Sequence, residues 1–481
     1  MTAPSPPALM TDLYQLTMLA GYHTEQMHEQ PATFDLFFRA APYMGSYAVF
    51  AGLDPALDYL EQLHFKPEEL GYLKQLGIFS DAFLDYLADF RFRGRVIAPH
   101  EGEVVFPHEP LLSVEGTLAE AQFVETTLLN IVNFQTLVAT KAARLALSAG
   151  DGEVLEFGLR RAQGPDGGLS VARAAAIGGV RSTSNVWAGQ AFGLPVKGTH
   201  AHSWVMAFPD ELSAFRAYAT SFPDSCVLLV DTYDTLRSGV PNAITVAREL
   251  REQGHELLGV RLDSGDLAYL SKATRRMLDE AGFPEVRIVA SNELDEYLID
   301  SIRHEGGYID IYGVGTRLAT CAGDGGGALG GVYKLVLIDG EPRLKTTSDL
   351  SKATLPGQKQ LLRLVRPDGL FELDLIALPG EQLTPSDIIV DPTAPERHRH
   401  FPTESSIIDL REEVMRDGRR LKPTASLESL GDYCKQRLQQ MPEGTLRLVN
   451  PHRYQVAISP ALASLRNELT TRFERQRPHK T

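Results

Sequence analysis

Two adjacent arginines, Arg160 and Arg161, follow an apolar segment at 154–157 and lie within the run Gly158-Leu-Arg-Arg-Ala-Gln-Gly164. Arginine side chains present a planar fork of N–H donors that matches the oxygens of a carboxylate or a phosphate. Taken alone, we would interpret the run as a solvated turn. An anion-binding role depends on whether other anion-binding residues follow neighbouring apolar segments.

A second candidate site for an anion is rich in glycine. Gly313-Val-Gly-Thr316 follows an apolar segment, and glycines at such a position let backbone N–H groups approach a phosphate. The run does not complete a dinucleotide-binding fingerprint, because Leu318 stands where the third glycine would be. No Gly-Lys pair occurs in the chain, so a P-loop is excluded. We therefore expect a phosphate site of the kind found in α/β barrels.

The run Asp263-Ser-Gly-Asp266 places two carboxylates close together at the end of another apolar segment. Carboxylates in this arrangement can hold a magnesium ion or the hydroxyl groups of a ribose. The alternative is structural, since Asp and Ser commonly cap the first turn of a helix. Both interpretations stay open at this point.

Two pairs of histidines, each separated by one residue, occur in the chain: His200 with His202, and His398 with His400. A metal site at the first pair would need a further ligand, and neither a His-Glu-x-x-His motif nor a cysteine partner supplies one. A single histidine that acts as a nucleophile or as an acid–base catalyst is the better interpretation of the first pair. We assign no function to the second pair, which we place in a solvated loop.

These residues follow a series of short apolar segments, which lie at 154–157, 195–197, 227–230, 257–262, 287–290 and 309–312. Asp231, Asp263 and Asn292 are 32 and 29 residues apart, about the length of one strand and one helix. Apolar strands that alternate with helices predict a parallel α/β sheet with polar residues along its carboxyl edge. In a barrel, that edge is the rim where chemistry is done. A doubly wound open sheet is the alternative.

The segment that precedes this series has a different character. Thr11 and Asp12 predict the cap of an N-terminal helix, and the alternating segment 33–39 predicts a strand that ends at Arg39. Short apolar runs separated by Gly and Pro between residues 95 and 114 predict a small antiparallel sheet. The N-terminal part of the chain therefore mixes helix and sheet.

The segment that follows the series is locally basic. Between residues 334 and 366, seven basic residues outnumber three acidic ones, although the chain as a whole is acidic. Further along, helical patterns occur near 424–440 and 461–474. We therefore divide the chain at about residues 130 and 345, into an N-terminal helix and sheet part, an α/β part that carries the candidate site residues and a C-terminal part, at 1–130, 131–345 and 346–481.

Composition excludes several classes of protein. The chain has 481 residues with 43% hydrophobic and 23% charged, which is ordinary for a folded globular protein. Its 47 basic and 62 acidic residues give a net charge of −15, which argues against a nucleic-acid-binding protein. Its three cysteines are widely spaced and form no metal motif, which favours a reducing compartment. We find neither a signal peptide nor a membrane span, and we expect a cytoplasmic protein.

Eight motifs follow one another in order along the chain. They are Thr11-Asp-Leu-Tyr-Gln15, Glu156-Phe-Gly-Leu-Arg-Arg-Ala-Gln-Gly-Pro-Asp-Gly-Gly168, Ser184-Asn-Val186, Gly198-Thr-His-Ala-His-Ser203, Arg261-Leu-Asp-Ser-Gly-Asp266, Gly313-Val-Gly-Thr316, Gly330-Gly-Val-Tyr-Lys334 and Lys352-Ala-Thr-Leu-Pro-Gly-Gln-Lys359. Together they resemble the nicotinate phosphoribosyltransferase family, from about residue 10 to 366 and more faintly beyond.

The resemblance implies an architecture and an activity. The family forms nicotinate mononucleotide and pyrophosphate from nicotinate and 5-phosphoribosyl 1-pyrophosphate, the first step of NAD salvage. It couples this reaction to ATP hydrolysis through a phosphorylated histidine, with Mg²⁺ as the cofactor. Its fold is an incomplete α/β barrel packed on a sheet domain built from both ends of the chain. The subunits form a homodimer that shares its active sites.

The resemblance also assigns roles to single residues. Phe157 and the partner subunit's Tyr14 would stack on the two faces of the pyridine ring. His202 would be the phosphorylated histidine, and Asp263 would meet the ribose or Mg²⁺. The residues implied to line the nicotinate carboxylate and the ribose are Arg160, Thr199 and Arg261. Those implied to bind the phosphates of phosphoribosyl pyrophosphate or ATP are Arg39, Arg261, Gly265, Gly313, Gly315, Thr316, Lys334, Lys352 and Lys359.

The substrate is predicted from one local difference. Related enzymes that use nicotinamide carry an Asp directly after the Gly-Thr pair, whereas this chain has His200 there and no acidic residue from Gly193 to Met206. A carboxylate at that place would repel nicotinate by about 1 kcal/mol or more. We therefore predict nicotinate as the substrate. The alternatives are a phosphoribosyltransferase acting on nicotinamide or another pyridine carboxylate, and a nucleotide sensor without catalytic activity.

Overall fold

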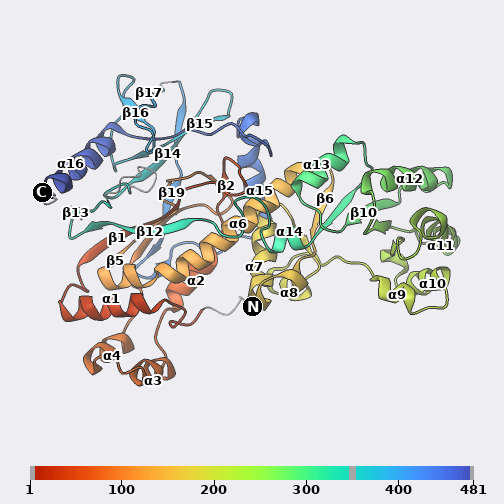
Figure 1. Cartoon of the computed structure of the whole chain (residues 1–481), viewed down its shortest axis with the longest axis horizontal. Helices are drawn as coiled ribbons and strands as arrows, with labels where there is room; N and C mark the ends of the chain where they lie inside the picture. Colours follow the sequence, from red (N-terminus) through yellow and green to blue (C-terminus); the bar gives the residue numbers. More distant parts are fainter. Residues whose placement is uncertain (1–5, 346–353, 403, 477–481) are drawn as a thin grey trace, which may run out of the picture. The chain divides into compact units, whose positions relative to one another are not determined.

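The computed structural model describes residues 6–345, 354–402 and 404–476, and the chain divides into two compact units (Figure 1). The central unit contains residues 141–323. The terminal unit combines residues 4–140 with 324–481, so it is built from both ends of the chain.

A parallel sheet forms the centre of the central unit. Its strands are β6 (Glu153–Glu156), β7 (Ser182–Thr183), β8 (Val227–Leu229), β9 (Gly259–Leu262), β10 (Arg287–Ser291) and β11 (Ile311–Val314). Their order is β7-β6-β11-β10-β9-β8, every neighbouring pair is parallel, and one further parallel bridge joins Thr183 to Val196. The carboxyl ends of these strands therefore meet at one edge.

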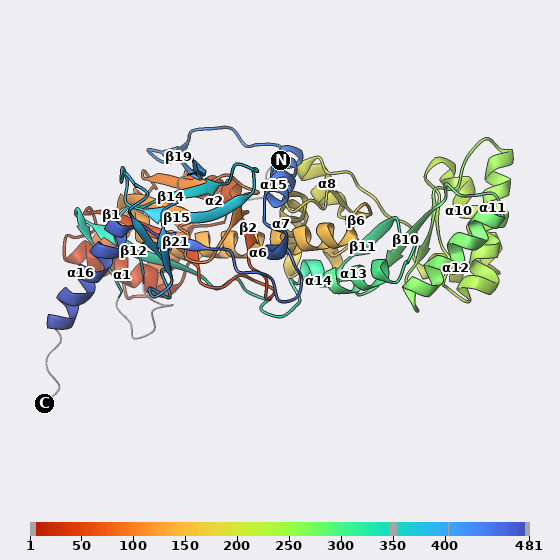
Figure 2. The ribbon, with the colours of Figure 1, turned by 90° about the horizontal axis from the view of Figure 1, so that it is seen from above.

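Helices connect the strands of the central unit. They are α7 (Gly164–Ile177), α8 (Val186–Phe192), α9 (His202–Met206), α10 (Glu211–Ser221), α11 (Val240–Glu252), α12 (Leu267–Glu280), α13 (Glu296–His304) and α14 (Thr316–Ala319). Both ribbon views show α10, α11 and α12 together on the side of β10 away from β6 (Figure 2). Helix α12 buries one stripe of residues, which includes Leu267, Ser271, Thr274 and Leu278.

The predicted parallel α/β arrangement of this region is confirmed, and the fold is mixed α/β. Four of the predicted apolar segments form β8 to β11, and the segment at 154–157 corresponds to β6. The strand expected at 195–197 is wrong, because this segment makes only the single bridge at Val196. The sequence pattern missed β7, whose residues Ser182 and Thr183 are polar although they are buried.

An antiparallel sheet in the terminal unit takes strands from both ends of the chain. Its strands are β1 (Pro31–Phe38), β3 (Arg95–Pro99), β5 (Leu112–Thr117), β12 (Gly331–Ile338), β13 (Glu341–Pro342), β19 (Arg411–Arg416) and β20 (Arg419–Arg420). The order is β13-β12-β1-β5-β3-β19-β20. The predicted strand at 33–39 is confirmed as β1, and it pairs with β5 on one side and with β12 on the other. This pairing joins the N-terminal segment to residues that follow the central unit.

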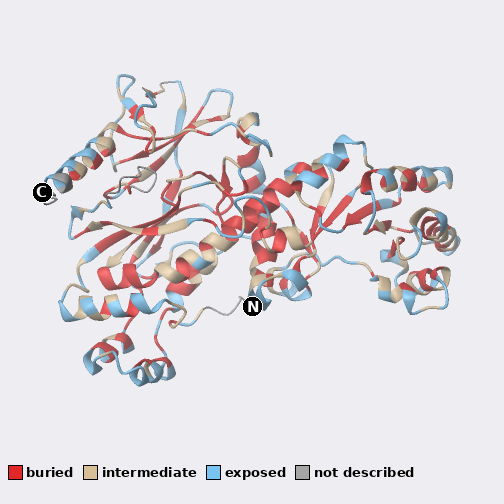
Figure 3. Ribbon diagram, in the orientation of Figure 1, coloured by how far each residue is buried: buried red, intermediate tan, exposed pale blue. Residues whose placement is uncertain are grey.

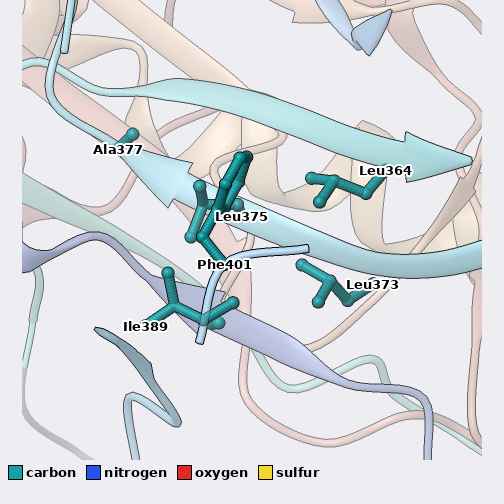
Figure 4. Close-up of a cluster of buried hydrophobic side chains, with 7 residues drawn as sticks. Leu364, Leu373, Leu375, Ala377, Ile389 and Phe401 are labelled. Carbon is teal, nitrogen blue, oxygen red and sulfur yellow. The ribbon is translucent and has the colours of Figure 1, made fainter. Parts of the chain in front are cut away.

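A second sheet of the terminal unit comes from the C-terminal segment. Its strands are β14 (Gln360–Val365), β15 (Phe371–Ala377), β16 (Ile388–Val390), β17 (His398–His400), β18 (Ser406–Asp409) and β21 (Val456–Ile458), in the order β17-β16-β21-β15-β14-β18. Neighbouring residues of β15 enter different cores. Leu375 packs with Phe401 and Ile389 on one face (Figure 4), whereas Ile376 packs with Leu462 on the other. The sheet is therefore buried on both faces.

Helices and a small sheet complete the terminal unit. The helices are α1 (Leu13–Thr24), α2 (Leu53–Gln62), α3 (Pro67–Gln75), α4 (Asp81–Ala88), α5 (Leu118–Phe123), α15 (Leu427–Gln439) and α16 (Pro460–Gln476), and β2 (Ala48–Val49) pairs with β4 (Val104–Val105). Helix α6 (Glu125–Ala149) begins in the terminal unit and ends in the central unit. It is largely buried along its length (Figure 3). Within the described ranges, every helix is too short or too polar to cross a membrane.

The predicted N-terminal helix is confirmed as α1, but its predicted cap is not. Asp12 precedes the helix in an extended conformation and makes no side-chain hydrogen bond to the first turn. Its carboxylate instead accepts a hydrogen bond from the hydroxyl of Thr126 at 2.9 Å. The Asp12 side chain therefore links the start of α1 to α6.

Candidate active site

Arg261 is the centre of a polar cluster at the carboxyl edge of the central sheet. It lies on β9, and its side chain is only 13% exposed. Its guanidinium donates from Nε to Ser291 Oγ at 2.8 Å, from Nη1 to Thr199 Oγ1 at 3.0 Å and from Nη2 to Asp263 Oδ1 at 2.9 Å. The same group lies 5.9 Å from the centre of the Phe157 ring. One arginine thus orients residues from four different segments.

His202 faces two carboxylates beside this cluster. Its Nε2 lies 3.6 Å from Asp263 Oδ2 and 4.0 Å from Asp231 Oδ1, and its Nδ1 lies 3.1 Å from Thr232 Oγ1. The His202 side chain is 41% exposed, whereas that of Asp231 is 1% exposed. A ligand can therefore reach the exposed part of the imidazole, while the two carboxylates lie close to Nε2.

Asp231 and Asp263 are ordered by their own hydrogen bonds. Asp231 Oδ2 accepts from the Asp263 backbone N–H at 3.0 Å and from Ser264 Oγ at 2.5 Å. Burial raises the pKa of Asp263, but Arg261 and hydrogen bonds from Ser291 and Arg261 outweigh burial, so the net pKa lies below its ordinary value. Asp263 is therefore ionised at neutral pH and favours a cation or a protonated imidazole nearby.

The two carboxylates of the Asp263–Asp266 run have different roles. Asp266 precedes α12 and accepts from the backbone N–H of Tyr269 at 3.0 Å, so it is a helix cap. Gly265 has φ +79°, and an added Cβ would lie 2.9 Å from Leu270. The turn therefore needs glycine there, and only Asp263 of the two aspartates faces His202.

The glycines after β11 make room for an aromatic ring. An added Cβ on Gly313 would lie 2.7 Å from two carbons of the Phe157 ring, and one on Gly315 would lie 3.1 Å from the Phe157 carbonyl oxygen. Phe157 is held in this place by the turn after β6, where the Glu156 carboxylate accepts from the Gly158 backbone N–H and from Thr183 Oγ1. The glycine spacing thus has a packing reason in addition to the predicted approach of a phosphate.

Thr316, predicted to contact a phosphate, has a partner within the chain. Its hydroxyl donates to Glu293 Oε1 at 2.9 Å, and Arg317 Nε lies 3.7 Å from the other oxygen of that carboxylate. Asn292 and Glu293, which follow β10, have φ +89° and +45°, a conformation that costs about 1–3 kcal/mol per residue when it is not glycine. Thr316 and Arg317, whose side chains can bind a phosphate, are thus both in contact with the Glu293 carboxylate.

Among the described residues, no group of three or more His, Cys, Asp or Glu side chains is arranged to hold a metal ion. Magnesium, however, commonly binds through one or two carboxylates together with waters and substrate phosphates. Asp231 Oδ1 is buried and has no hydrogen-bond partner among the described residues, and Asp263 Oδ2 faces the same imidazole. These two oxygens fit that mode of binding.

Several predicted site residues belong to the terminal unit. Tyr14, in the first turn of α1, is 47% exposed and lines a cavity of about 380 Å³ with Asn130 and Asn133 of α6. Arg39 follows β1, and Lys334 lies on β12. Burial lowers the pKa of Lys334, and Lys345 and Arg39 lower it further although Glu125 opposes them. The lowered pKa of Lys334 therefore comes mainly from its burial.

Lys359 differs from the other predicted lysines because it is buried. Its Nζ lies 2.8 Å from Asp35 Oδ2 and donates to the Leu355 carbonyl at 2.9 Å. Burial lowers its pKa, and the Asp35 carboxylate opposes that shift. Lys352 lies outside the described residues.

The central unit brings together Phe157, Thr199, Arg261, Asp263 and His202 by direct contacts, and Gly313 by its contact with Phe157. Arg160 is exposed on the turn after Phe157, and Thr316 contacts Glu293 rather than this cluster. Sequence reasoning left Asp231, Thr232, Ser291 and Glu293 out of the site. Asp231 and Ser291 lie at the ends of predicted strands, so their position in the apolar series was the available signal.

These features define an α/β protein with an arginine, two carboxylates and a histidine clustered at the carboxyl edge of a parallel sheet. Family models of the nicotinate phosphoribosyltransferase (NAPRTase) N-terminal domain, family and C-terminal domain match residues 9–133, 153–366 and 358–466, respectively. The chain therefore belongs to the nicotinate phosphoribosyltransferase family.

Individual relatives match over nearly the whole chain. Nicotinate phosphoribosyltransferase of Bacillus subtilis (strain 168) is 45% identical over 468 residues, covering 94% of this chain and 93% of the relative. The crystal structure of human nicotinic acid phosphoribosyltransferase is similar at a TM-score of 0.85 and 34% identity, covering 95% and 99% of the two chains. Nicotinate-nucleotide pyrophosphorylase from Pyrococcus furiosus, at 21% identity and a TM-score of 0.69, shares the fold.

Proposed function

We propose that this chain forms nicotinate mononucleotide and pyrophosphate from nicotinate and 5-phosphoribosyl 1-pyrophosphate, coupled to ATP hydrolysis through phosphorylation of His202. Family membership supports the transfer reaction. The observation that carries the assignment to this site is the cluster in which Arg261 joins Thr199 and Asp263 beside the Phe157 ring.

The cluster suits the substrates of this reaction. The flat pyridine ring can stack on Phe157, and a guanidinium within 6 Å of that ring favours a carboxylate substituent. The pyridine nitrogen attacks the ribose C1 as pyrophosphate leaves, so negative charge grows on the departing oxygens. Fixed cations stabilise that charge because they need not reorganise as it develops. The cations that the family resemblance proposes for this role are Arg261, Arg39, Lys334, Lys352 and Lys359. Of these, Lys359 is buried and lies 2.8 Å from Asp35 Oδ2.

The surroundings of His202 suit phosphoryl transfer from ATP. Two carboxylates face Nε2, so they favour the ring proton at that nitrogen. The lone pair of Nδ1, which lies 3.1 Å from Thr232 Oγ1, becomes the nucleophile when that hydroxyl turns aside. The new bond joins Nδ1 to the γ-phosphorus as the bond to the ADP oxygen breaks. The phosphorylated ring is then positively charged, and Asp231 and Asp263 stabilise it. We propose that phosphorylation tightens substrate binding and that its loss drives product release.

Asp263 and Asp231 are the residues that would hold Mg²⁺ in this proposal. The ion would supply charge neutralisation for the phosphates of the substrates. The Asp263 carboxylate remains ionised for this purpose because burial raises its pKa but Arg261 and Ser291 lower it by more.

We also propose the architecture implied by the family resemblance. The order of the central strands follows the chain, with β11 beside β6, which supports an α/β barrel left open between Val196 and β8. The domains would be 1–130, 131–345 and 346–481. The exposure of Tyr14 supports a homodimer in which this ring enters the partner's site. The three widely spaced cysteines Cys226, Cys321 and Cys434, all buried, support a cytoplasmic compartment.

The experiment that tests this function measures pyridine mononucleotide formation by mass spectrometry. Purified protein is given phosphoribosyl pyrophosphate with either nicotinate or nicotinamide, with and without ATP, and His202→Ala is run in parallel. We expect nicotinate mononucleotide, faster with ATP, and loss of the acceleration in the variant. A preference for nicotinamide would show that nicotinamide, and not nicotinate, is the substrate. No product under any condition would favour a nucleotide sensor without catalytic activity.

A further inference from the structure

The loop that carries the proposed phosphohistidine has no regular secondary structure. Residues 197–201 connect the bridge at Val196 to His202, the first residue of α9. His202 must nevertheless stay beside Thr232, Asp231 and Asp263, which come from two other loops. Some contact must therefore fix this loop against the sheet.

His200 makes such a contact through its Nε2, while its Nδ1 contacts Ala201 within the loop itself. Its side chain is buried, with 7% of the residue exposed. Nε2 accepts a hydrogen bond from the backbone N–H of Leu229 at 3.2 Å, and Nδ1 lies 3.4 Å from the carbonyl oxygen of Ala201. The ring packs edge-on against Tyr218 of α10, with centroids 4.7 Å apart. His200 thus points into the interior and not toward Arg261.

The hydrogen bond from Leu229 N–H to His200 replaces one that a further strand of the sheet would accept. Strand β8 is the last strand of the sheet, and Val230 N–H donates to the Arg261 carbonyl of β9 at 3.1 Å. Because successive N–H groups of a strand point to opposite sides, the N–H of Leu229 points away from β9. At this edge a buried N–H needs an acceptor, and His200 Nε2 takes the place of a strand carbonyl.

We propose that His200 is a positioning residue that joins the loop before His202 to the strand before Asp231 and Thr232, and so sets the geometry in which His202 is phosphorylated. We name this pair of bonds, from His200 to Leu229 and to Ala201, the His200 link. The inference rests on the proposed role of His202.

The protonation state of His200 supports the link. Burial lowers the pKa of His200 to about 4; Arg261 and His202 lower it as well, whereas the bond to Ala201 raises it. The ring is therefore neutral at neutral pH and keeps the lone pair on Nε2 that accepts from Leu229.

The test compares two substitutions at His200 with one packing control. In His200→Gln the side-chain carbonyl can still accept from Leu229, whereas in His200→Leu nothing can. Phe215→Leu, in α10 beside the same ring at 6.2 Å, weakens the packing and leaves the link intact. Each full-length variant is assayed for nicotinate mononucleotide formation with and without ATP, for phosphohistidine, and for deuterium uptake in peptides that cover residues 225–233.

For His200→Leu we expect faster deuterium uptake at residues 225–233 and a roughly tenfold loss of ATP-dependent acceleration. His200→Gln should stay within roughly threefold of the wild type, and Phe215→Leu should lower the melting temperature without losing ATP coupling. If His200→Leu keeps full coupling, or Phe215→Leu loses it to the same degree, the proposal is overturned.

The exchange measurement separates this inference from the proposed function. If the wild type itself gains nothing from ATP, the phosphohistidine role fails and takes the positioning role with it. The His200 link is then still decided, because equal uptake in the Gln and Leu variants would show that Leu229 does not depend on the imidazole.

Discussion

At the scale of single residues, the site depends on a few buried polar groups whose partners come from different loops. Arg261 donates to three side chains and lies beside an aromatic ring. The side chain of Asp231 is only 1% exposed, and its Oδ1 has no hydrogen-bond donor among the described residues. Such an oxygen is costly to bury unless a ligand or a charged ring uses it.

Replacing Arg261 by Lys should lower kcat/KM for nicotinate by roughly 100-fold. A lysine cannot reach Ser291, Thr199 and Asp263 at once, because it lacks the planar fork of the guanidinium. Steady-state kinetics measure the effect. The control is Arg216→Lys, an arginine on α10 that is 49% exposed and paired with Glu249. A loss of less than threefold at Arg261 would contradict the central role given to it.

Replacing Asp231 by Asn should reduce phosphohistidine formation by about tenfold or more. The substitution keeps the size of the side chain but removes a charge 4.0 Å from His202 Nε2. Radiolabel transferred from γ-labelled ATP into acid-labile phosphate measures it. Asp234→Asn is the matched control, since Asp234 caps the following turn and asparagine caps equally well. Equal labelling of the Asp231 variant and the wild type would remove Asp231 from the mechanism.

At the scale of elements, the parallel strands determine which residues meet. Strands β6, β8, β9, β10 and β11 all end at one edge, so side chains far apart in sequence become neighbours there. The ends of β6 and β11 approach so closely that glycine is required between them, as the Gly313–Phe157 contact shows. Packing between elements and ligand binding therefore place demands on the same residues.

Replacing Gly313 by Ala should raise KM for nicotinate by roughly tenfold. The added methyl group would lie 2.7 Å from the Phe157 ring, so the ring must move from the position proposed for stacking. Kinetics at saturating phosphoribosyl pyrophosphate measure KM, and circular dichroism checks the fold. Gly167→Ala serves as the control, because an added Cβ there meets no atom within 4 Å. An unchanged KM in the Gly313 variant would argue against a stacking role for Phe157.

At the scale of the whole molecule, a buried charge network holds both ends of the chain together in the terminal unit. Arg363 of β14 donates to Glu103 at 2.5 Å and to Asp374 of β15 at 2.5 and 2.8 Å, and its side chain is fully buried. Arg437 of α15 donates to the same Glu103 at 2.9 Å. Glu103 comes from the N-terminal segment, and the other three residues come from beyond residue 360.

Replacing Arg363 by Met should destabilise the protein by about 3–5 kcal/mol, because Asp374 and part of Glu103 would be left buried without a counter-charge. Arg366→Met, three residues further on, removes an exposed arginine paired with Asp368 and should cost little. Urea unfolding midpoints of the two variants measure the difference. Equal midpoints would show that the network does not carry stability.

Glu109 gives this network a pH dependence. Burial raises the pKa of Glu109 well above its ordinary value of 4.5, and Asp374 raises it further although Arg363 opposes both. A raised pKa means that the native state holds a proton that the unfolded state releases, so the contribution to stability is full below pH 4.5 and is lost as pH rises. Glu109→Gln keeps a neutral side chain. It should therefore gain stability over the wild type between about pH 5 and 8, by roughly 1–2 kcal/mol in urea titrations. A constant difference across this range would contradict a protonated Glu109.

Particular residues show which features of the fold and the site could be predicted from the sequence and which could not. Apolar segments of regular spacing predicted β6 and β8 to β11, because strands buried on both faces need continuous runs of apolar residues. Asp263 was found for the same reason, as a polar residue that follows such a segment, whereas His202 was singled out by the family resemblance. β7 was missed because two buried polar residues leave no apolar signal, and the pairing of 195–197 was overestimated because a segment of three residues cannot indicate how much pairing it makes.

The sequence by itself determined the family, the parallel sheet and the residue types at its carboxyl edge, since these follow from local pattern and from motifs that are continuous in the chain. Only the tertiary structure decided which of those residues meet. It separated Asp263 from Asp266, added Asp231 and Ser291 to the cluster, and turned His200 away from the site toward Leu229. The physical reason is that hydrogen bonds and ion pairs act over about 3–4 Å in space, and the distance along the chain does not reveal which loops come that close.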